Sequence, residues 1–449
     1  MYGTVQAPLA FWKENAKHLH RIGMLQSKAD PCVWYKLKDG HLWLIVAVYV
    51  DDIAYAGCND ARNWFKEEVQ KRFKISDLGK LKKHLGVWYE KKCDNEGPYY
   101  QLKMEKYQAE LLQDWKELTG KEPRHVKTPA YPGESLTKNV NDEIINVEGY
   151  RKILGKAMWF CKKIMPECGN AIRELATHMD KPGQDHWRAM ERLIGYIANN
   201  DPATLVLRKP KDLKVYGYVD SNFATNKDNR KSVTGYVLTI GGCLVSYSSK
   251  SQATVTLSST EAEYVAASTC ATEIKFIQML LEEVMPGETI RPATILEDNT
   301  GAIFLMENQA VGNRTKHIDI KMHHIREMMS GEDPRLCVVF TPSEWNFADP
   351  MTKNVTEIIH RVLIPELKDG RIAKRIFEIV EREDVRNHVG QRTRRRNMDK
   401  PRETDSNLLS TNLGNCEPWI LVRKRQKGSS TNGTRHVQTG NTQDGDKKG

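Results

Sequence analysis

The sequence predicts an α/β protein of two or three domains, and three observations support this fold class. The chain has 449 residues, too many for one hydrophobic core, and its composition of 39% hydrophobic and 28% charged residues is ordinary. An apolar, β-branched strand pair occupies residues 44–56. In the second half, strand-like runs alternate with helical patterns, an order typical of a mixed five-stranded sheet flanked by helices.

The strand pair carries two adjacent carboxylates. The apolar runs 44–50 and 53–56 flank Asp51 and Asp52, which lie where a hairpin would turn. Neighbouring carboxylates repel each other, and a hard divalent cation such as Mg²⁺ is the usual compensation. For a bare Asp-Asp pair an ordinary acidic turn is the simpler explanation, so the two residues alone do not establish a metal site.

The remainder of the first half predicts a mixture of helices and short strands. Helical spacing of apolar residues is present in four stretches: 12–25, 61–73, 104–118 and 150–199. A strand and turn are predicted over 75–87, where Gly79 and Gly86 suit turns, and a short strand over 99–102. The polar, Pro-containing stretch 128–147 is predicted to be a surface linker.

The second half predicts a meander of three strands followed by alternating helices and strands. The predicted strands are 213–220, 233–240, 243–248, 293–296 and 337–340. Gly241 and Gly242 give a short hairpin signal between the second and third strands. A helix begins near Leu257, with Thr260 and Glu263 spaced as a capping box.

Four acids occupy the ends of these elements: Asp220, Glu263, Asp298 and Asp349. Carboxylates at such positions can converge on one point, where together they would bind two Mg²⁺ ions. Each acid alone has a simpler explanation, because Glu263 and Asp298 could cap helices and Asp349 could face solvent. Glu261 competes with Glu263, although two residues along a helix point in different directions.

Several segments resemble the Pol polyproteins of copia-type long-terminal-repeat retrotransposons. They include Tyr-Val-Asp-Asp at 49–52, Tyr-Gly-x-x-Gln-Ala-Pro at 2–8, Asp-Leu-Gly-x-Leu at 77–81, Tyr-Arg at 150–151, His-Trp at 186–187 and Ala-Asp-x-x-Thr-Lys at 348–353. The resemblance covers about residues 1–355. It implies part of a reverse transcriptase, a connection segment and a ribonuclease H-like domain.

The resemblance assigns roles to residues of the first half. Asp51 and Asp52 would bind the polymerase metal ions, and Gly3, Gln6 and Tyr49 would position the template and nucleotide. Polymerases of this type need a third carboxylate from an earlier strand. We expect the palm to be truncated before Met1, with this carboxylate and the fingers missing.

In the second half, the resemblance makes Asp220, Glu263, Asp298 and Asp349 the metal ligands of a ribonuclease H. His317 and Arg326 would contact the substrate strand. Zinc binding by His317, His323 and His324 is an alternative, although no Cys accompanies them at a suitable spacing. Surface histidines are a third interpretation. For Trp159 and Trp187, packing on a bound duplex and simple core packing are both open.

The implied function is cleavage of the RNA strand of RNA–DNA hybrids with Mg²⁺, or with Mn²⁺. The palm would, if completed upstream, copy template RNA from a primer strand. The alternative is a non-catalytic, nucleic-acid-binding remnant of a degraded element. Other element-encoded proteins are expected partners, and the cytoplasm, in virus-like particles, and the nucleus are the expected locations.

The predicted domain organisation has five parts: partial palm and thumb 1–127, helical connection 128–210, ribonuclease H-like domain 211–355, helical extension 356–384 and disordered basic tail 385–449. The tail has 14 Lys and Arg against 6 Asp and Glu, so the other residues carry only about +2 of the net charge of +10. Arg392–Arg396 is a basic run that suits nucleic-acid binding, nuclear import or a solvated tail.

Nine Cys without a Cys-x-x-Cys pair fit neither a disulfide framework nor a zinc module, and indicate a reducing compartment. No apolar run reaches the length of a membrane span, so no membrane partner is expected.

Overall fold

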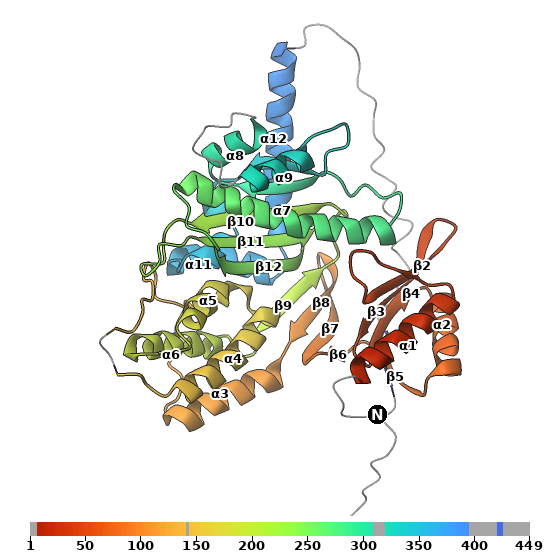
Figure 1. The fold of residues 1–449 in the computed structure, drawn as a ribbon, viewed down its shortest axis with the longest axis horizontal. Helices are drawn as coiled ribbons and strands as arrows, with labels where there is room; N and C mark the ends of the chain where they lie inside the picture. Colours follow the sequence, from red (N-terminus) through yellow and green to blue (C-terminus); the bar gives the residue numbers. More distant parts are fainter. Residues whose placement is uncertain (1–6, 141–142, 309–318, 395–419, 425–449) are drawn as a thin grey trace, which may run out of the picture.

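The computed structural model describes residues 7–140, 143–308, 319–394 and 420–424, and it places them in three sheets with flanking helices (Figure 1). The predicted α/β class, with a five-stranded mixed sheet in the second half, is confirmed. Within the described residues, no helix combines the length and the apolar character needed to cross a membrane.

The N-terminal sheet contains the Asp-Asp hairpin. Its strand order is β1-β2-β3-β4-β15-β5. The elements are α1 (Ala7–Arg21), β1 (Leu25–Gln26), β2 (Val33–Lys38), β3 (His41–Tyr49), β4 (Asp52–Gly57), α2 (Asn59–Arg72) and β5 (Ile75–Lys80). Tyr49 pairs with Asp52, so Val50 and Asp51 form the two-residue loop, with Val50 at a φ of 54°. The predicted hairpin is therefore present, with one carboxylate in the turn and the other on the first residue of β4.

The strand β15 (Ile420–Lys424) lies between β4 and β5 and pairs antiparallel with both. The sequence predicts residues 385–449 to be a tail without regular structure, and the structure differs from that expectation here and in a helix that continues to Arg394. The apolar run at 420–422 can add to a sheet because both neighbouring strands offer unpaired backbone groups. Its partners lie more than 300 residues away in the sequence, so no local pattern identifies them. The other residues beyond 394 lie outside the described part.

A four-stranded sheet and a group of helices follow. The strands, in the order β6-β7-β8-β9, are β6 (Lys83–His84), β7 (Val87–Asp94), β8 (Gly97–Lys103) and β9 (Thr204–Arg208). The helices are α3 (Glu105–Thr119), α4 (Val147–Ile164), η1 (Pro166–Cys168), α5 (Gly169–Thr177) and α6 (Gln184–Asn199). The helical region predicted over 150–199 is confirmed, whereas β9 is absent from the prediction because only its pairing with β8 makes it a strand.

The two tryptophans of these helices differ in their surroundings. The indole Nε1 of Trp187 donates to the carbonyl of Ile145 at 2.9 Å, and its ring packs edge-on against Tyr150. Trp187 is therefore a core aromatic. Trp159 is 41% exposed, and the ammonium of Lys163 lies 5.1 Å from its ring centroid.

Two buried histidines stack at the junction of α5 and α6. The rings of His178 and His186 are 4.3 Å apart. His186 accepts from the amide of Gly183 through Nδ1, and its Nε2 lies 2.8 Å from the carbonyl of Thr137, an arrangement that suits the neutral ring. Burial, with the neighbouring His186, lowers the pKa of His178 to about 4.

We expect this stack to make the protein less stable in acid. Because the pKa of His178 is depressed in the folded state, the unfolded chain takes up a proton first as the pH falls from 6.5 to 4. The loss is up to about 3 kcal/mol for a full shift of this size. Thermal unfolding of the wild type and of His178→Gln at pH 7.5 and 5 measures it. A midpoint difference between the two proteins that does not change with pH would contradict the assignment.

The third sheet has the order β12-β11-β10-β13-β14, in which the first three strands are antiparallel and the others parallel. Its strands are β10 (Val215–Asn222), β11 (Val233–Ile240), β12 (Cys243–Ser251), β13 (Ala293–Glu297) and β14 (Leu336–Phe340). Its helices are α7 (Ser259–Val284), α8 (Thr300–Glu307), α9 (Asp319–Met329), η3 (Ser343–Trp345), α10 (Asp349–Thr352), α11 (Glu357–Lys368) and α12 (Ile372–Arg394).

Helices cover both faces of this sheet. Residues of α7, α8 and α9 form one buried cluster with alternate positions of β10, such as Val215 and Val219. The intervening positions, such as Tyr216 and Tyr218, belong to a second cluster that includes α4, α10, α11 and α12. In Figure 1, α7 crosses β10 and β11 above the sheet, with α11 on the opposite side. The strand β10 is thus buried on both faces, and a carboxylate on it lies in the interior.

Candidate metal centre

Parallel pairing of β10 with β13 brings two of the predicted acids together. Tyr218 is the register partner of Leu296, and two more residues along each strand lead to Asp220 and Asp298. Asp220 lies within β10 and is 1% exposed, whereas Asp298 follows the end of β13 and is half-buried. The sheet register therefore explains how residues 78 positions apart in the sequence become neighbours.

The third acid comes from the first turn of α7, and the cap of this helix decides which glutamate it is. Ser258 is the N-cap, since its hydroxyl accepts from the amide of Glu261 at 3.1 Å. The carboxylate of Glu261 in turn accepts from the amide of Leu257 at 2.8 Å. The capping box predicted for Thr260 and Glu263 is wrong in register by two residues. The helix therefore does not use the side chain of Glu263 for capping.

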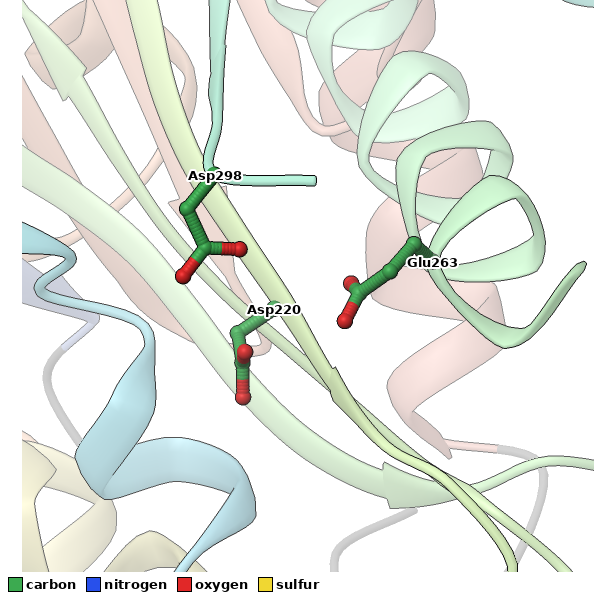
Figure 2. A group of neighbouring side chains, drawn as sticks. All are labelled: Asp220, Glu263 and Asp298. Carbon is green, nitrogen blue, oxygen red and sulfur yellow. The ribbon is translucent and has the colours of Figure 1, made fainter. Parts of the chain in front are cut away.

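Asp220, Glu263 and Asp298 lie next to one another (Figure 2), and each offers a carboxylate oxygen within 4.8 Å of the other two. Glu263 is 6% exposed, and its Oε2 is buried without a hydrogen-bond partner. An unsatisfied buried carboxylate oxygen is costly unless a cation completes it. Hard oxygen ligands in this number suit Mg²⁺ or Mn²⁺. These residues therefore fit a divalent metal ion.

The fourth predicted acid, Asp349, lies beside Asp220 on the short helix α10. Asp349 is 8% exposed and is not one of the three acids whose oxygens form the close group. The helix can approach the sheet because Gly235, the register partner of Asp220, has no side chain. A Cβ atom there would lie 2.6 Å from Cγ2 of Thr352 and 2.7 Å from Cβ of Met351. Gly235 thus sets the distance between α10 and β10.

Three further residues border the site and are not among the predicted site residues. Lys353 Nζ lies 3.0 Å from Oδ1 of Asp220 and 2.9 Å from Oδ1 of Asp349. The hydroxyl of Thr352 donates to Oδ2 of Asp220. Glu297 is fully buried, with its Oε1 accepting from the amide of Asn299 at 3.0 Å and its Oε2 without a partner. Thr352 and Lys353 are part of the Ala-Asp-x-x-Thr-Lys segment, so the sequence contained a signal for them; Glu297 had only its position next to Asp298.

Burial and mutual repulsion shift Asp220, Glu263 and Asp349 toward their protonated forms when no metal ion is bound. Burial raises the pKa of Asp220 to about 7, against the opposing charge of Lys353. Burial and the neighbouring Glu297 raise the pKa of Glu263 to about 11. Burial also raises the pKa of Asp349. A divalent cation would reverse these shifts, because it stabilises the ionised carboxylates.

The remaining predicted site residues are distributed elsewhere. Asp52 is 7% exposed, and its Oδ2 lies 3.9 Å from Nδ1 of His84, while the neighbouring Tyr49 is 53% exposed. Among the described residues, Asp220, Glu263 and Asp298 form a close group of three metal-ligating side chains, whereas Asp51 and Asp52 belong to no such group.

Most of the residues predicted to contact substrate lie outside the described residues, and Arg326 is hydrogen-bonded within the protein. Gly3, Gln6 and His317 lie outside the described part. Arg326 Nη2 donates to the carbonyls of Leu305 and Asn308, at 3.1 and 2.8 Å, and so binds the C-terminal end of α8. Its contact with substrate remains a prediction.

Comparisons with known proteins relate about four fifths of the chain to one class of protein. Residues 1–131 match the family described as reverse transcriptase (RNA-dependent DNA polymerase). The chain is similar to the retrovirus-related Pol polyprotein from transposon TNT 1-94 of Nicotiana tabacum, with 29% identity over 79% of this chain and 26% of that protein. It is also similar to the corresponding polyprotein from transposon RE1 of Arabidopsis thaliana, with 32% identity over 79% of this chain and 23% of that protein. The chain thus spans about a quarter of the length of these relatives.

Among solved structures, the chain is similar to LC11-RNase H1 in complex with an RNA/DNA hybrid. The two share 19% identity with a TM-score of 0.24, and the match covers 31% of this chain and 93% of that one.

Proposed function

We propose a function from the premise that the chain belongs to the Pol polyproteins of copia-type retrotransposons. We infer that residues 211–355 hydrolyse the RNA strand of RNA–DNA hybrids, with Mg²⁺ or Mn²⁺ as cofactor. The observation that carries this proposal is the group of Asp220, Glu263 and Asp298, with Asp349 beside Asp220.

In the proposed reaction, Asp220, Glu263 and Asp298 each have a role as a metal ligand. Divalent ions held here would activate a water molecule and steady the leaving oxygen of the phosphodiester. Asp220 lies between the other ligands, so its two oxygens can serve both ends of the site. Glu263 offers its unpartnered oxygen from α7, and Asp298 faces more open space at the end of β13. The rigid sheet and α7 keep these oxygens in place before the substrate arrives.

Cleavage of defined nucleic acids tests the proposal. The full chain is incubated with end-labelled RNA in a hybrid with DNA, the same RNA alone, and duplex DNA, each with Mg²⁺, Mn²⁺ or EDTA. We expect cutting of RNA in the hybrid with either metal ion and none with EDTA. Duplex DNA should be spared, because hybrid shape and the 2′-hydroxyls select the substrate. Tight hybrid binding without any cleavage would favour the alternative, a non-catalytic nucleic-acid-binding remnant.

For the hairpin, we propose that Asp51 and Asp52 are two of the metal ligands of an RNA-directed DNA polymerase palm, with template RNA and a primer strand as partners. Two-metal catalysis needs further ligands, and among the residues that the structure describes this pair belongs to no close group of three or more ligating side chains. We therefore expect no primer extension by this chain alone on a primed RNA template with nucleotides and Mg²⁺. Extension that Asp51→Asn abolishes would contradict this expectation.

The domain boundaries, the association with other element-encoded proteins, and residence in cytoplasmic virus-like particles and the nucleus belong to the same proposal.

A further inference from the structure

The ammonium of Lys353 lies between two buried carboxylates of the site. Its Nζ is within hydrogen-bond distance of Oδ1 of both Asp220 and Asp349. The side chains of the two acids are 1% and 12% exposed, whereas that of Lys353 is 40% exposed. The ammonium therefore closes this end of the site from the solvent side, and it has open space into which it can withdraw.

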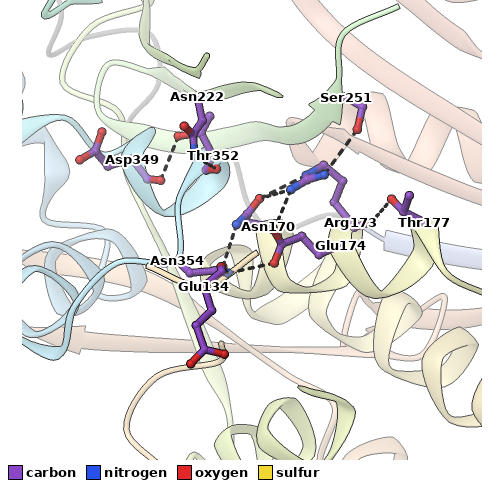
Figure 3. A network of polar contacts seen from close by, with 10 residues as sticks. All are labelled: Glu134, Asn170, Arg173, Glu174, Thr177, Asn222, Ser251, Asp349, Thr352 and Asn354. Atoms are coloured by element: carbon purple, nitrogen blue, oxygen red, sulfur yellow. Dashed lines mark hydrogen bonds and ion pairs between the residues drawn. The ribbon is translucent and has the colours of Figure 1, made fainter. Parts of the chain in front are cut away.

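Hydrogen bonds hold the residues on both sides of Lys353, through the backbone of Thr352 and the side chain of Asn354 (Figure 3). Before it, Nδ2 of Asn222 donates to the carbonyl of Thr352 at 3.2 Å. After it, Nδ2 of Asn354 donates to Oε2 of Glu174 at 2.9 Å, and Oδ1 of Asn354 accepts from Asn170 at 2.7 Å. The helix α5 thus holds the segment that follows α10. If Lys353 moves, its flexible side chain must move while its backbone stays.

The two ends of the acidic site differ in what compensates their charge. Between Asp220 and Asp349 a lysine ammonium does so, a compact point charge on a flexible stem. At the other end, Asp220 and Asp298 meet Glu263, whose Oε2 has no hydrogen-bond partner. Two buried carboxylates side by side need a cation to remain ionised. A metal ion between Asp220 and Asp349 would have to take the place of the ammonium.

We propose that Lys353 is a positioning residue: it holds Asp220 and Asp349 together in the metal-free protein and competes with a metal ion for that end of the site. This inference rests on the proposed function, since it takes the site to bind divalent ions. Metal ions then bind in two unequal steps. The first occupies the end formed by Asp220, Glu263 and Asp298, and the second, weaker step displaces the Lys353 ammonium.

Calorimetric titration of the full chain with Mn²⁺ tests the competition. Lys353→Met keeps the length of the side chain and removes the charge. We expect the second step to become at least about 10-fold tighter in this variant, with the first step unchanged within about twofold. Lys353→Arg keeps the charge, so its second step should stay weak. Lys17→Met, which removes an exposed lysine on α1, is the control and should match the wild type.

Thermal unfolding measures the effect of Lys353 on stability without a metal ion bound at the site. In EDTA, Lys353→Met should unfold at a lower temperature than the wild type, because Asp220 and Asp349 lose their shared cation. Saturating Mn²⁺ should remove most of that difference.

A second step that is unchanged, weaker or missing in Lys353→Met would overturn the competition. If the wild type shows no Mn²⁺ step at all, the proposed function fails, and an unfolding difference in EDTA would then leave Lys353 as an ion-pair residue only. If Lys353→Met does not fold, Lys353→Gln, which also removes the charge, takes its place, and a second Mn²⁺ step that is no tighter than that of the wild type would overturn the competition.

Discussion

Asp220→Asn is expected to reduce the rate of RNA cleavage in an RNA–DNA hybrid by at least about 10²-fold, the scale of losing one preorganised electrostatic stabiliser. Asn has nearly the volume of Asp but lacks the charge, and Asp220 is the acid that borders both Glu263 and Asp349. Asp298→Asn should have a loss of similar size, since Asp298 completes the close group. Single-turnover cleavage at saturating Mg²⁺ measures both effects.

Whether Asp220→Asn folds normally can be checked separately from its cleavage activity. The Asn carbonyl oxygen can replace Oδ1 and accept from Lys353, and its amide group can donate to the Thr352 hydroxyl, which still donates to the carbonyl of Asp349. The buried negative charge is gone. The thermal midpoint in EDTA should therefore be no lower than that of the wild type, while the stabilisation by Mn²⁺ should shrink. Full nuclease activity in either Asp220→Asn or Asp298→Asn would refute the site. A variant that unfolds early in EDTA would instead show that Asp220 is needed for the fold.

Most strands of the two functional sheets follow from local patterns. The β3–β4 hairpin is predictable because continuous apolar, β-branched runs flank a two-residue turn. The β11–β12 hairpin is predictable for a similar reason, since Gly241 and Gly242 adopt the positive φ angles that such a turn requires. The strands β9 and β15 are different. Each is short, and each becomes a strand through pairing with a distant segment, so the information lies in the partner.

The site shows the same division between local and distant information. Strands that end near Asp220 and just before Asp298 predict that the two acids can converge, whereas the parallel pairing of β10 with β13 that brings them together is known only from the fold. The position of the helix cap could not be resolved, because Ser258 and Thr260 are both good caps and differ only in register. The role of Lys353 depends on the contact between α10 and β10, which Gly235 permits and no spacing rule reveals.

Glu263→Gln and Glu261→Gln should have very different effects, although the two residues are only two positions apart on α7. Glu263→Gln removes a ligand charge from the group with Asp220 and Asp298, and we expect a loss of at least about 10²-fold in cleavage rate. Glu261→Gln should change the rate less than about threefold, because a Gln oxygen can still accept from the amide of Leu257. Calorimetry should show weakened Mn²⁺ binding for the first variant alone. The reverse ranking, in rate and in metal affinity, would exchange the two assignments while leaving Asp220 and Asp298 as ligands.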